Sequence, residues 1–147
     1  MPFNPLYDTL SITSRQWHSR GQRFDPACNV RIGAGVKIVN PQYVSLGDNV
    51  TLSDDVTLIA RGEGGITIQS GAYLCERVYL DTEDEDDGYI VVGERVYLGT
   101  GTTMFGHKGL EIGDDTLIAQ NVTLTPYSHI FDDPTRNILV KAVTPEK

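Results

Sequence analysis

The chain has 147 residues, 39% of them hydrophobic, and a formal net charge of −8, which fits one globular domain. The acidic balance argues against nucleic acid and anionic membranes as partners. No apolar run reaches the ~20 residues of a membrane span, and the start, MPFNPLYDTL, lacks the basic and apolar segments of a signal peptide. We therefore expect a cytoplasmic protein without membrane insertion, whose two cysteines stay reduced.

Residues 1–25 do not share the pattern that follows them. Pro2 and Pro5 interrupt regular structure, and Thr9 to Arg20 could form a short helix. Capping segments are expected wherever a repeat array begins, because the first repeat has an uncovered edge. We interpret residues 1–25 as an irregular or short-helical N-terminal cap.

From Pro26 onward an apolar residue recurs every six positions, apart from short insertions. A six-residue period is neither the 3.6 of a helix nor the 2 of an ordinary half-buried strand, so it predicts short strands separated by regular corners. Small or β-branched residues follow four positions later in most repeats, such as Val50, Val56 and Val96. The leading positions are Ile32, Ile38, Leu46, Leu52, Leu58, Ile68, Leu74, Leu80, Val92, Leu98, Met104, Ile112, Ile118 and Leu124.

The repeats group into larger units that begin at Pro26, Leu46, Ile68, Val92 and Ile112, spaced 20, 22, 24 and 20 residues apart. Three six-residue repeats account for most of each unit, and the remainder falls at one recurring place. The extra residues are Gly62 to Gly65, Thr82 to Tyr89 and Lys108 to Leu110. Insertions at one corner lie on one edge of a stack. The spacing predicts a prism of about five coils, stacked ~4.8 Å apart, from Pro26 to Leu124.

Three segments, LGDNVTLSDDVTL, VGERVYLGTGTTM and IGDDTLIAQNVTL, resemble the hexapeptide-repeat acyltransferase family. The resemblance implies an all-β fold, a left-handed parallel β-helix, over residues 26–128, followed by a histidine loop and tail over 129–147. The longer match IGDDTLIAQNVTLTPYSHIFDDPTRNI resembles the sugar and polysaccharide O-acetyltransferases of maltose, galactoside and capsular type. It implies acetyl transfer from acetyl coenzyme A to a sugar hydroxyl.

The resemblance carries His129 over as the catalytic base. Neutral histidine is the usual side chain for removing a hydroxyl proton near pH 7. His107 lies one coil earlier and could line the same cleft, and Tyr127 could pack over the acceptor. Asp132 and Asp133 are candidates to fix the His129 tautomer. The match TPYSHIFDDP and the corner location of His129 lead us to expect direct transfer without an acyl-enzyme.

The family continues past the histidine loop with further coils that hold acetyl coenzyme A between subunits of a homotrimer. We expect the same trimer here. The sequence ends at ILVKAVTPEK, where the next coil should begin, so we expect residues 1–147 alone to bind acetyl coenzyme A weakly. The asparagine that the maltose and galactoside enzymes use for the acceptor is not evident near Thr102 to Phe105.

Two other functions stay open. One is a catalytically incomplete β-helix that only assembles. The other is a γ-type carbonic anhydrase, which needs three converging histidines. The chain offers only His18, His107 and His129, without the close pair typical of that family, so no metal is expected. The acidic run from Asp81 to Asp87 is interpreted as a solvated loop, with a weak calcium site as the rival reading.

Overall fold

The computed structural model describes residues 9–11, 29–83, 86–129 and 143–145. Side chains are described only within residues 29–83 and 86–126. A short 3₁₀ helix, η2 (Pro41–Tyr43), is the helical element of these ranges. The strands are β1 (Thr9–Ser11), β2 (Arg31–Ile32), β3 (Lys37–Val39), β4 (Val44–Leu46), β5 (Thr51–Leu52), β6 (Thr57–Ile59), β7 (Ile66–Ile68), β8 (Tyr73–Leu74), β9 (Tyr79–Asp81), β10 (Ile90–Val92), β11 (Tyr97–Leu98), β12 (Thr103–Phe105), β13 (Leu110–Ile112), β14 (Leu117–Ile118), β15 (Thr123–Leu124), β16 (Tyr127–His129) and β17 (Val143–Pro145).

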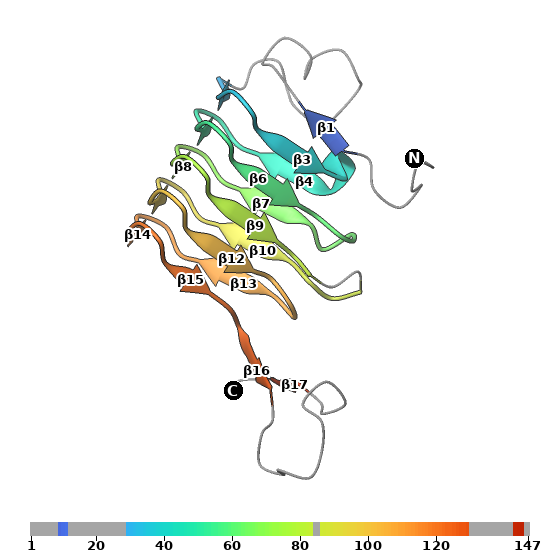
Figure 1. Ribbon diagram of the computed structural model, residues 1–147. Coiled ribbons are helices and arrows are strands. Elements are labelled where there is room, and N and C mark those ends of the chain that lie inside the picture. The colour runs from blue at the N-terminus through green and yellow to red at the C-terminus, as the bar shows by residue number, and fades with distance from the viewer. Residues whose placement is uncertain (1–8, 12–28, 84–85, 130–142, 146–147) are drawn as a thin grey trace.

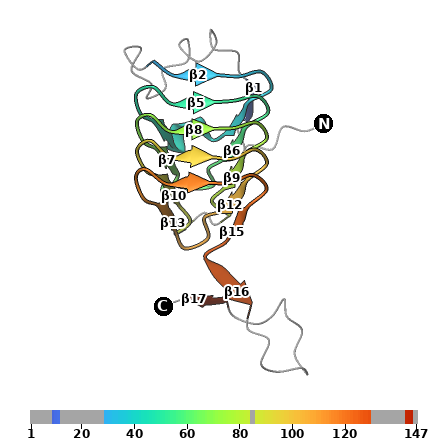
Figure 2. The same ribbon diagram turned by 90° about the vertical axis from the view of Figure 1, so that its left-hand side faces the viewer.

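The strands wind into a parallel β-solenoid with three flat faces (Figures 1 and 2). The first face contains β2, β5, β8, β11 and β14, and the second contains β3, β6, β9, β12 and β15. The third contains β4, β7, β10 and β13. The described strands thus make four complete coils and two strands of a fifth, which confirms the predicted architecture. The left-handed sense of the winding stays a prediction.

The fourteen leading positions of the repeat form three ladders inside the solenoid. On the first face, Ile32 pairs with Leu52, Leu52 with Leu74, Leu74 with Leu98, and Leu98 with Ile118. The second ladder is Ile38, Leu58, Leu80, Met104 and Leu124, and the third is Leu46, Ile68, Val92 and Ile112. Leu52, Leu74 and Leu98 have no exposed surface at all. The predicted core is therefore the observed core.

Several corners place asparagine, aspartate or glycine in a left-handed backbone. Asn49 and Asp115 have φ values of 57° each, which asparagine and aspartate accept more readily than most residues. The neighbouring acidic side chains cap the coil before them: Asp54 Oδ1 accepts from Ala34 N–H, and Asp114 Oδ1 accepts from Glu94 N–H, both at 2.8 Å. The asparagine and aspartate residues at these corners thus act as turn residues. A Cβ at Gly47 would lie 2.6 Å from Ser70 N, which explains why a glycine follows Leu46.

The N-terminal cap begins with a strand where the sequence suggested a helix. Residues 9–11 form β1, which pairs antiparallel with β3 in the register Leu10 to Ile38. The first coil leaves the backbone groups of β3 open on one side, and a strand satisfies them where a helix does not. The expectation of a helix from Thr9 is wrong for residues 9–11, and the remainder up to Arg20 lies outside the described residues.

The last two strands leave the solenoid. β16 follows β15 and extends beyond the final coil, where it pairs antiparallel with β17 (Figure 1). Ile112, Ile118 and Leu124, on the last strand of each face, are half-buried, whereas their partners one coil earlier are fully buried. Among the described residues, no helix is long and apolar enough to cross a membrane.

Candidate active site

His129 ends β16, and its backbone pairs with Val143. Tyr127 begins the same strand, opposite Pro145. The side chains of Tyr127 and His129 and the whole of Asp132 and Asp133 lie outside the described residues, so their roles stay predictions. What the structure adds is the backbone position: His129 lies beyond the last coil, on a strand held by antiparallel pairing.

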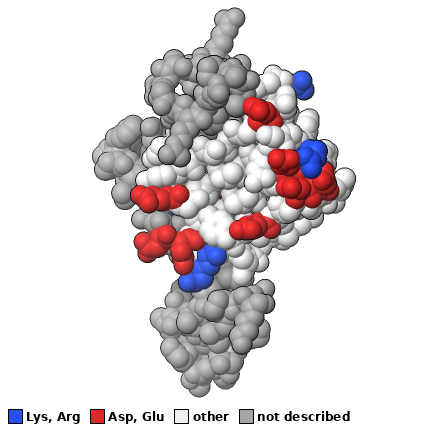
Figure 3. All heavy atoms as spheres, turned by 180° about the vertical axis from the view of Figure 1, so that it is seen from behind, with Lys and Arg blue, Asp and Glu red and all other residues white. Residues whose placement is uncertain are grey.

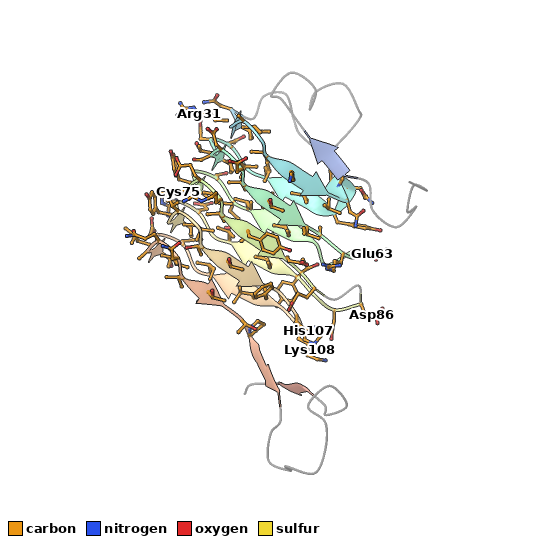
Figure 4. The ribbon with its side chains drawn as sticks, in the orientation of Figure 1. Arg31, Glu63, Cys75, Asp86, His107 and Lys108 are labelled. Atoms are coloured by element: carbon orange, nitrogen blue, oxygen red, sulfur yellow. The ribbon has the colours of Figure 1, made fainter. Side chains whose placement is uncertain are left out.

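His107 lies in the loop between β12 and β13. The loop is fixed from both sides, because Gly106 N–H donates to Asp81 O and Gly109 N–H donates to Gly106 O, each at 2.8 Å. Lys108 takes a left-handed backbone with φ of 60°, and its Nζ lies 3.4 Å from Asp87 Oδ2. Figure 4 shows His107 and Lys108 on the same edge of the solenoid as Glu63 and Asp86. The insertions predicted from the repeat therefore gather on one edge.

A buried ion pair stabilises the same edge. Asp81 ends β9 with only 3% of its surface exposed. Its two carboxylate oxygens accept from Arg61 Nε at 2.7 Å and Arg61 Nη2 at 2.8 Å. Tyr79 Oη donates to Oδ2 at 3.0 Å, and Glu83 N–H donates to Oδ1 at 2.8 Å. Asp81 is thus a structural residue, and its reading as part of a solvated acidic loop is wrong.

The network sets the protonation of its members. Burial alone would raise the pKa of Asp81, but the hydrogen bonds from Arg61 and Glu83 and the positive charge of Arg61 hold that pKa below its ordinary value. Burial, followed by the nearby Asp81 carboxylate, raises the pKa of the Tyr79 hydroxyl. Tyr79 therefore stays protonated at neutral pH and serves as a donor to Asp81, not as a base.

Replacing Asp81 with asparagine is expected to destabilise the protein by about 2–4 kcal/mol at neutral pH, because it removes the buried negative charge that pairs with Arg61. The pKa of Asp81 is lower in the folded protein than in the unfolded chain, where it is ~3.9. The ionised carboxylate therefore contributes its full stabilisation above that unfolded pKa, and the stabilisation is lost as pH falls through the folded pKa. Urea unfolding of the unchanged protein and of Asp81→Asn measures their free energies of unfolding. The difference between the two should be largest at neutral pH and should shrink below about pH 4.

Asp115→Asn is the matched control. Asp115 accepts from Arg95 Nε and Nη2 at 2.7 and 2.9 Å, nearly the geometry of the Asp81 pair, but on the surface. Exposed pairs contribute little because water and salt screen them. Equal destabilisation by the two substitutions would contradict the role assigned to burial of Asp81.

The first face carries a row of exposed apolar side chains that sequence reasoning missed. Tyr73 and Tyr97 pair in register and stack with ring centroids 5.7 Å apart, and each is 42% exposed. Leu117 follows in the same row, 73% exposed. Each precedes a core leucine or isoleucine by one position, so the repeat register itself could have revealed the row. We call Tyr73, Tyr97 and Leu117 the aromatic row.

Acidic side chains dominate the charged groups on one face of the described surface. Seen from behind, it shows several acidic patches with few basic side chains among them (Figure 3). Within residues 29–83 and 86–126, no three histidine, cysteine, aspartate or glutamate side chains come together as a metal site. His18 and the side chain of His129, needed for the carbonic anhydrase alternative, lie outside these ranges.

The sequence is similar to two curated proteins, from Escherichia coli (strain K12) and Shigella flexneri, which both carry the provisional name colanic acid biosynthesis acetyltransferase WcaF. Each is 35% identical over 99 residues, covering 61% of this chain and 52% of the relative. The chain thus spans about half the length of the curated relatives it matches. No protein-family model matches the sequence. No solved structure matches it either.

The six-residue repeat, the parallel solenoid that it forms and the similarity to these two proteins agree with one another. They agree with the resemblance stated from the sequence: the chain forms a parallel β-solenoid of six-residue repeats, and 99 of its residues are similar to two proteins named as acetyltransferases.

Proposed function

We propose that the protein is an O-acetyltransferase that moves an acetyl group from acetyl coenzyme A to a hydroxyl of a sugar or polysaccharide precursor. The observation that carries the proposal is the 35% identity to two proteins named as acetyltransferases of polysaccharide biosynthesis. The parallel β-solenoid that the six-residue repeat predicts is also the fold of the described residues. A cytoplasmic location goes with this proposal, because acetyl coenzyme A is an intracellular donor.

In the proposed reaction, His129 accepts the proton of the sugar hydroxyl while the hydroxyl oxygen attacks the thioester carbonyl. The carbon–sulfur bond then breaks, and the proton passes to the departing coenzyme A thiolate. The acetyl group ends on the sugar oxygen, and no covalent enzyme intermediate forms. We assign Tyr127, Asp132, Asp133 and His107 to the acceptor side of the same site. No metal takes part in this scheme.

Labelled acetyl coenzyme A tests the activity directly. The purified protein, in a form shown by calorimetry to bind the donor, is incubated with it and with a panel of neutral mono- and oligosaccharides, and thiol release and acceptor mass are followed. We expect equal amounts of free thiol and acetylated sugar. If the label stays on coenzyme A with every acceptor while the protein is folded, the enzyme proposal fails and the assembly function takes its place.

We also propose a homotrimer, built through the aromatic row. The strands β8, β11 and β14 lie side by side in a flat parallel sheet (Figure 2). They carry the exposed side chains of Tyr73, Tyr97 and Leu117 in consecutive coils. Exposed apolar area of this kind favours a protein–protein contact, and three identical prisms can close around a threefold axis.

Replacing Leu117 with aspartate should leave the fold intact and shift the trimer toward monomer, because the new charge would be buried without a partner in the interface. Light scattering at micromolar concentration measures the mass, and circular dichroism confirms folding. As a control, Thr103→Asp changes an outward position on the second face and should leave the mass unchanged. A folded Leu117→Asp protein with the trimer mass would show that the aromatic row lies outside the interface.

A further inference from the structure

A groove of about 370 Å³ lies on the third face, away from the strand that carries His129. Its floor is the paired strands β4 and β7, where Ser45 and Thr67 stand in register on the outer surface. Gln42 and Tyr43 of η2 form one wall, and Glu63, in the loop between β6 and β7, forms the other. Its volume is within the range of sites that bind small molecules.

The walls of the groove are fixed by the main chain. Asn40 takes a left-handed backbone before η2, and its side-chain Nδ2 donates to Ala60 O at 2.8 Å in a buried position. Tyr43 N–H donates to Asn40 O at 2.9 Å, which closes the turn of η2. Across the groove, Gly65 has φ of 61° and approaches Tyr43 so closely that a Cβ at Gly65 would collide with the Tyr43 carbonyl. The groove is therefore preformed.

The lining has the chemistry of a neutral, hydroxyl-rich ligand. Two hydroxyls, an amide, a phenol ring and a carboxylate line this space, and no lysine or arginine of residues 29–83 and 86–126 lines it. Among the described residues, no hydrogen bond occupies the side chains of Gln42, Ser45 or Thr67, so their donors and acceptors are available. Phosphate-bearing ligands would meet the Glu63 carboxylate and no positive charge, which disfavours them.

From this lining we propose that the groove binds a neutral saccharide. The ring of Tyr43 offers an apolar platform for the face of a sugar ring. The Gln42 amide and the Glu63 carboxylate offer acceptors and donors for its hydroxyls. This site is separate from the one that contains His129, since β4 and β7 lie in the first coils and β16 lies beyond the last (Figure 1).

The position of the groove suits a saccharide chain that extends toward the proposed catalytic site. Glu63 lies on the same edge of the solenoid as His107 (Figure 4), and their loops belong to coils two steps apart, which corresponds to ~10 Å along the stack. A saccharide chain could therefore occupy the groove with one part while another part reaches the histidine end. This use, though not the binding itself, rests on the proposed acetyl transfer.

Titration of the isotope-labelled protein with maltotetraose and cellotetraose, followed by NMR of the backbone amides, tests the proposal. We expect shifts at residues of η2, β4 and the loop 60–65, and at least tenfold weaker binding when Gln42→Ala and Glu63→Gln are combined. Both side chains are exposed, so the double variant should fold normally, as thermal unfolding will show. Thr123→Val, an exposed hydroxyl on the second face, is the control that should bind like the unchanged protein.

Three results would overturn the proposal: no amide shifts at the groove with either sugar, unchanged affinity of the double variant, or binding of inorganic phosphate in the groove. The experiment needs no acetyl coenzyme A, and we expect the same shifts in His129→Ala. Sugar binding without any acetyl transfer would therefore refute the proposed function alone. Acetyl transfer without shifts at the groove would refute this inference alone.

Discussion

Replacing Leu98 with aspartate is expected to abolish folding of the solenoid. Leu98 has no exposed surface and lies between Leu74 and Ile118 in the ladder of the first face. Truncating such a leucine alone costs about 2–5 kcal/mol through the cavity it leaves. An unpaired carboxylate in the same place adds several kcal/mol more. The sum of the cavity and buried-charge costs is comparable to the 5–15 kcal/mol free energy of unfolding of a typical domain.

Leu117→Asp provides the matched comparison, because it is the same substitution on the adjacent strand β14. Leu117 points outward and is 73% exposed, so the charge stays in water in a single subunit. Circular dichroism and urea unfolding should show a folded Leu117→Asp protein and an unfolded Leu98→Asp protein. A cooperative unfolding transition in Leu98→Asp near that of the unchanged protein would contradict the assignment of this ladder to the core.

The fold could be predicted from the sequence because a solenoid repeats one local pattern. Each coil contacts its neighbours in the same way, so a period of six with insertions at one corner determines which residues pair. Leu52, Leu74 and Leu98 stack as expected, although 22 and 24 residues separate them. The parallel register follows directly from such counting, without knowledge of any tertiary contact.

Contacts that do not repeat could not be predicted in this way. Arg61 and Asp81 each occur once, and nothing in the repeat indicates that one carboxylate of an acidic run is buried against a partly exposed guanidinium. The strand β1 depends on the open edge of β3, which only the assembled first coil provides. The groove beside η2 depends on the path of the loop 60–65, and its residues share no motif.

The candidate site was predicted from resemblance to a family, and only part of it lies within the described side chains. His107 lies at the edge where the insertions gather, as the spacing indicated. Tyr127 and His129 occupy a strand beyond the last coil. The repeat ends near Leu124, so the periodicity that placed the core has no information about the residues that follow it.

Replacing His129 with alanine is expected to lower kcat by about a hundredfold or more, which is the usual effect of losing a general base. The loss arises because the sugar hydroxyl would then have to give its proton to water during the attack. Folding should be unaffected, since β16 pairs with β17 through backbone groups that alanine retains. Affinity for acetyl coenzyme A, measured by calorimetry, should stay the same.

His18→Ala is the control, because it removes a histidine from the N-terminal cap region, to which no part of the proposed reaction is assigned. The unchanged protein and the two variants are compared for folding by thermal unfolding and for activity by thiol release at saturating acetyl coenzyme A. Thermal unfolding is measured before activity. If His129→Ala does not fold, His129→Gln is used instead, because glutamine keeps a polar side chain but cannot act as the base.

The most direct test of the proposed mechanism is the rate of sugar acetylation by the unchanged protein and by His129→Ala, in a form that turns over acetyl coenzyme A. General-base catalysis by His129 predicts that the variant binds the donor normally and acetylates the sugar about a hundredfold more slowly or worse. Full activity in the folded variant would contradict it and would show that His129 is a bystander.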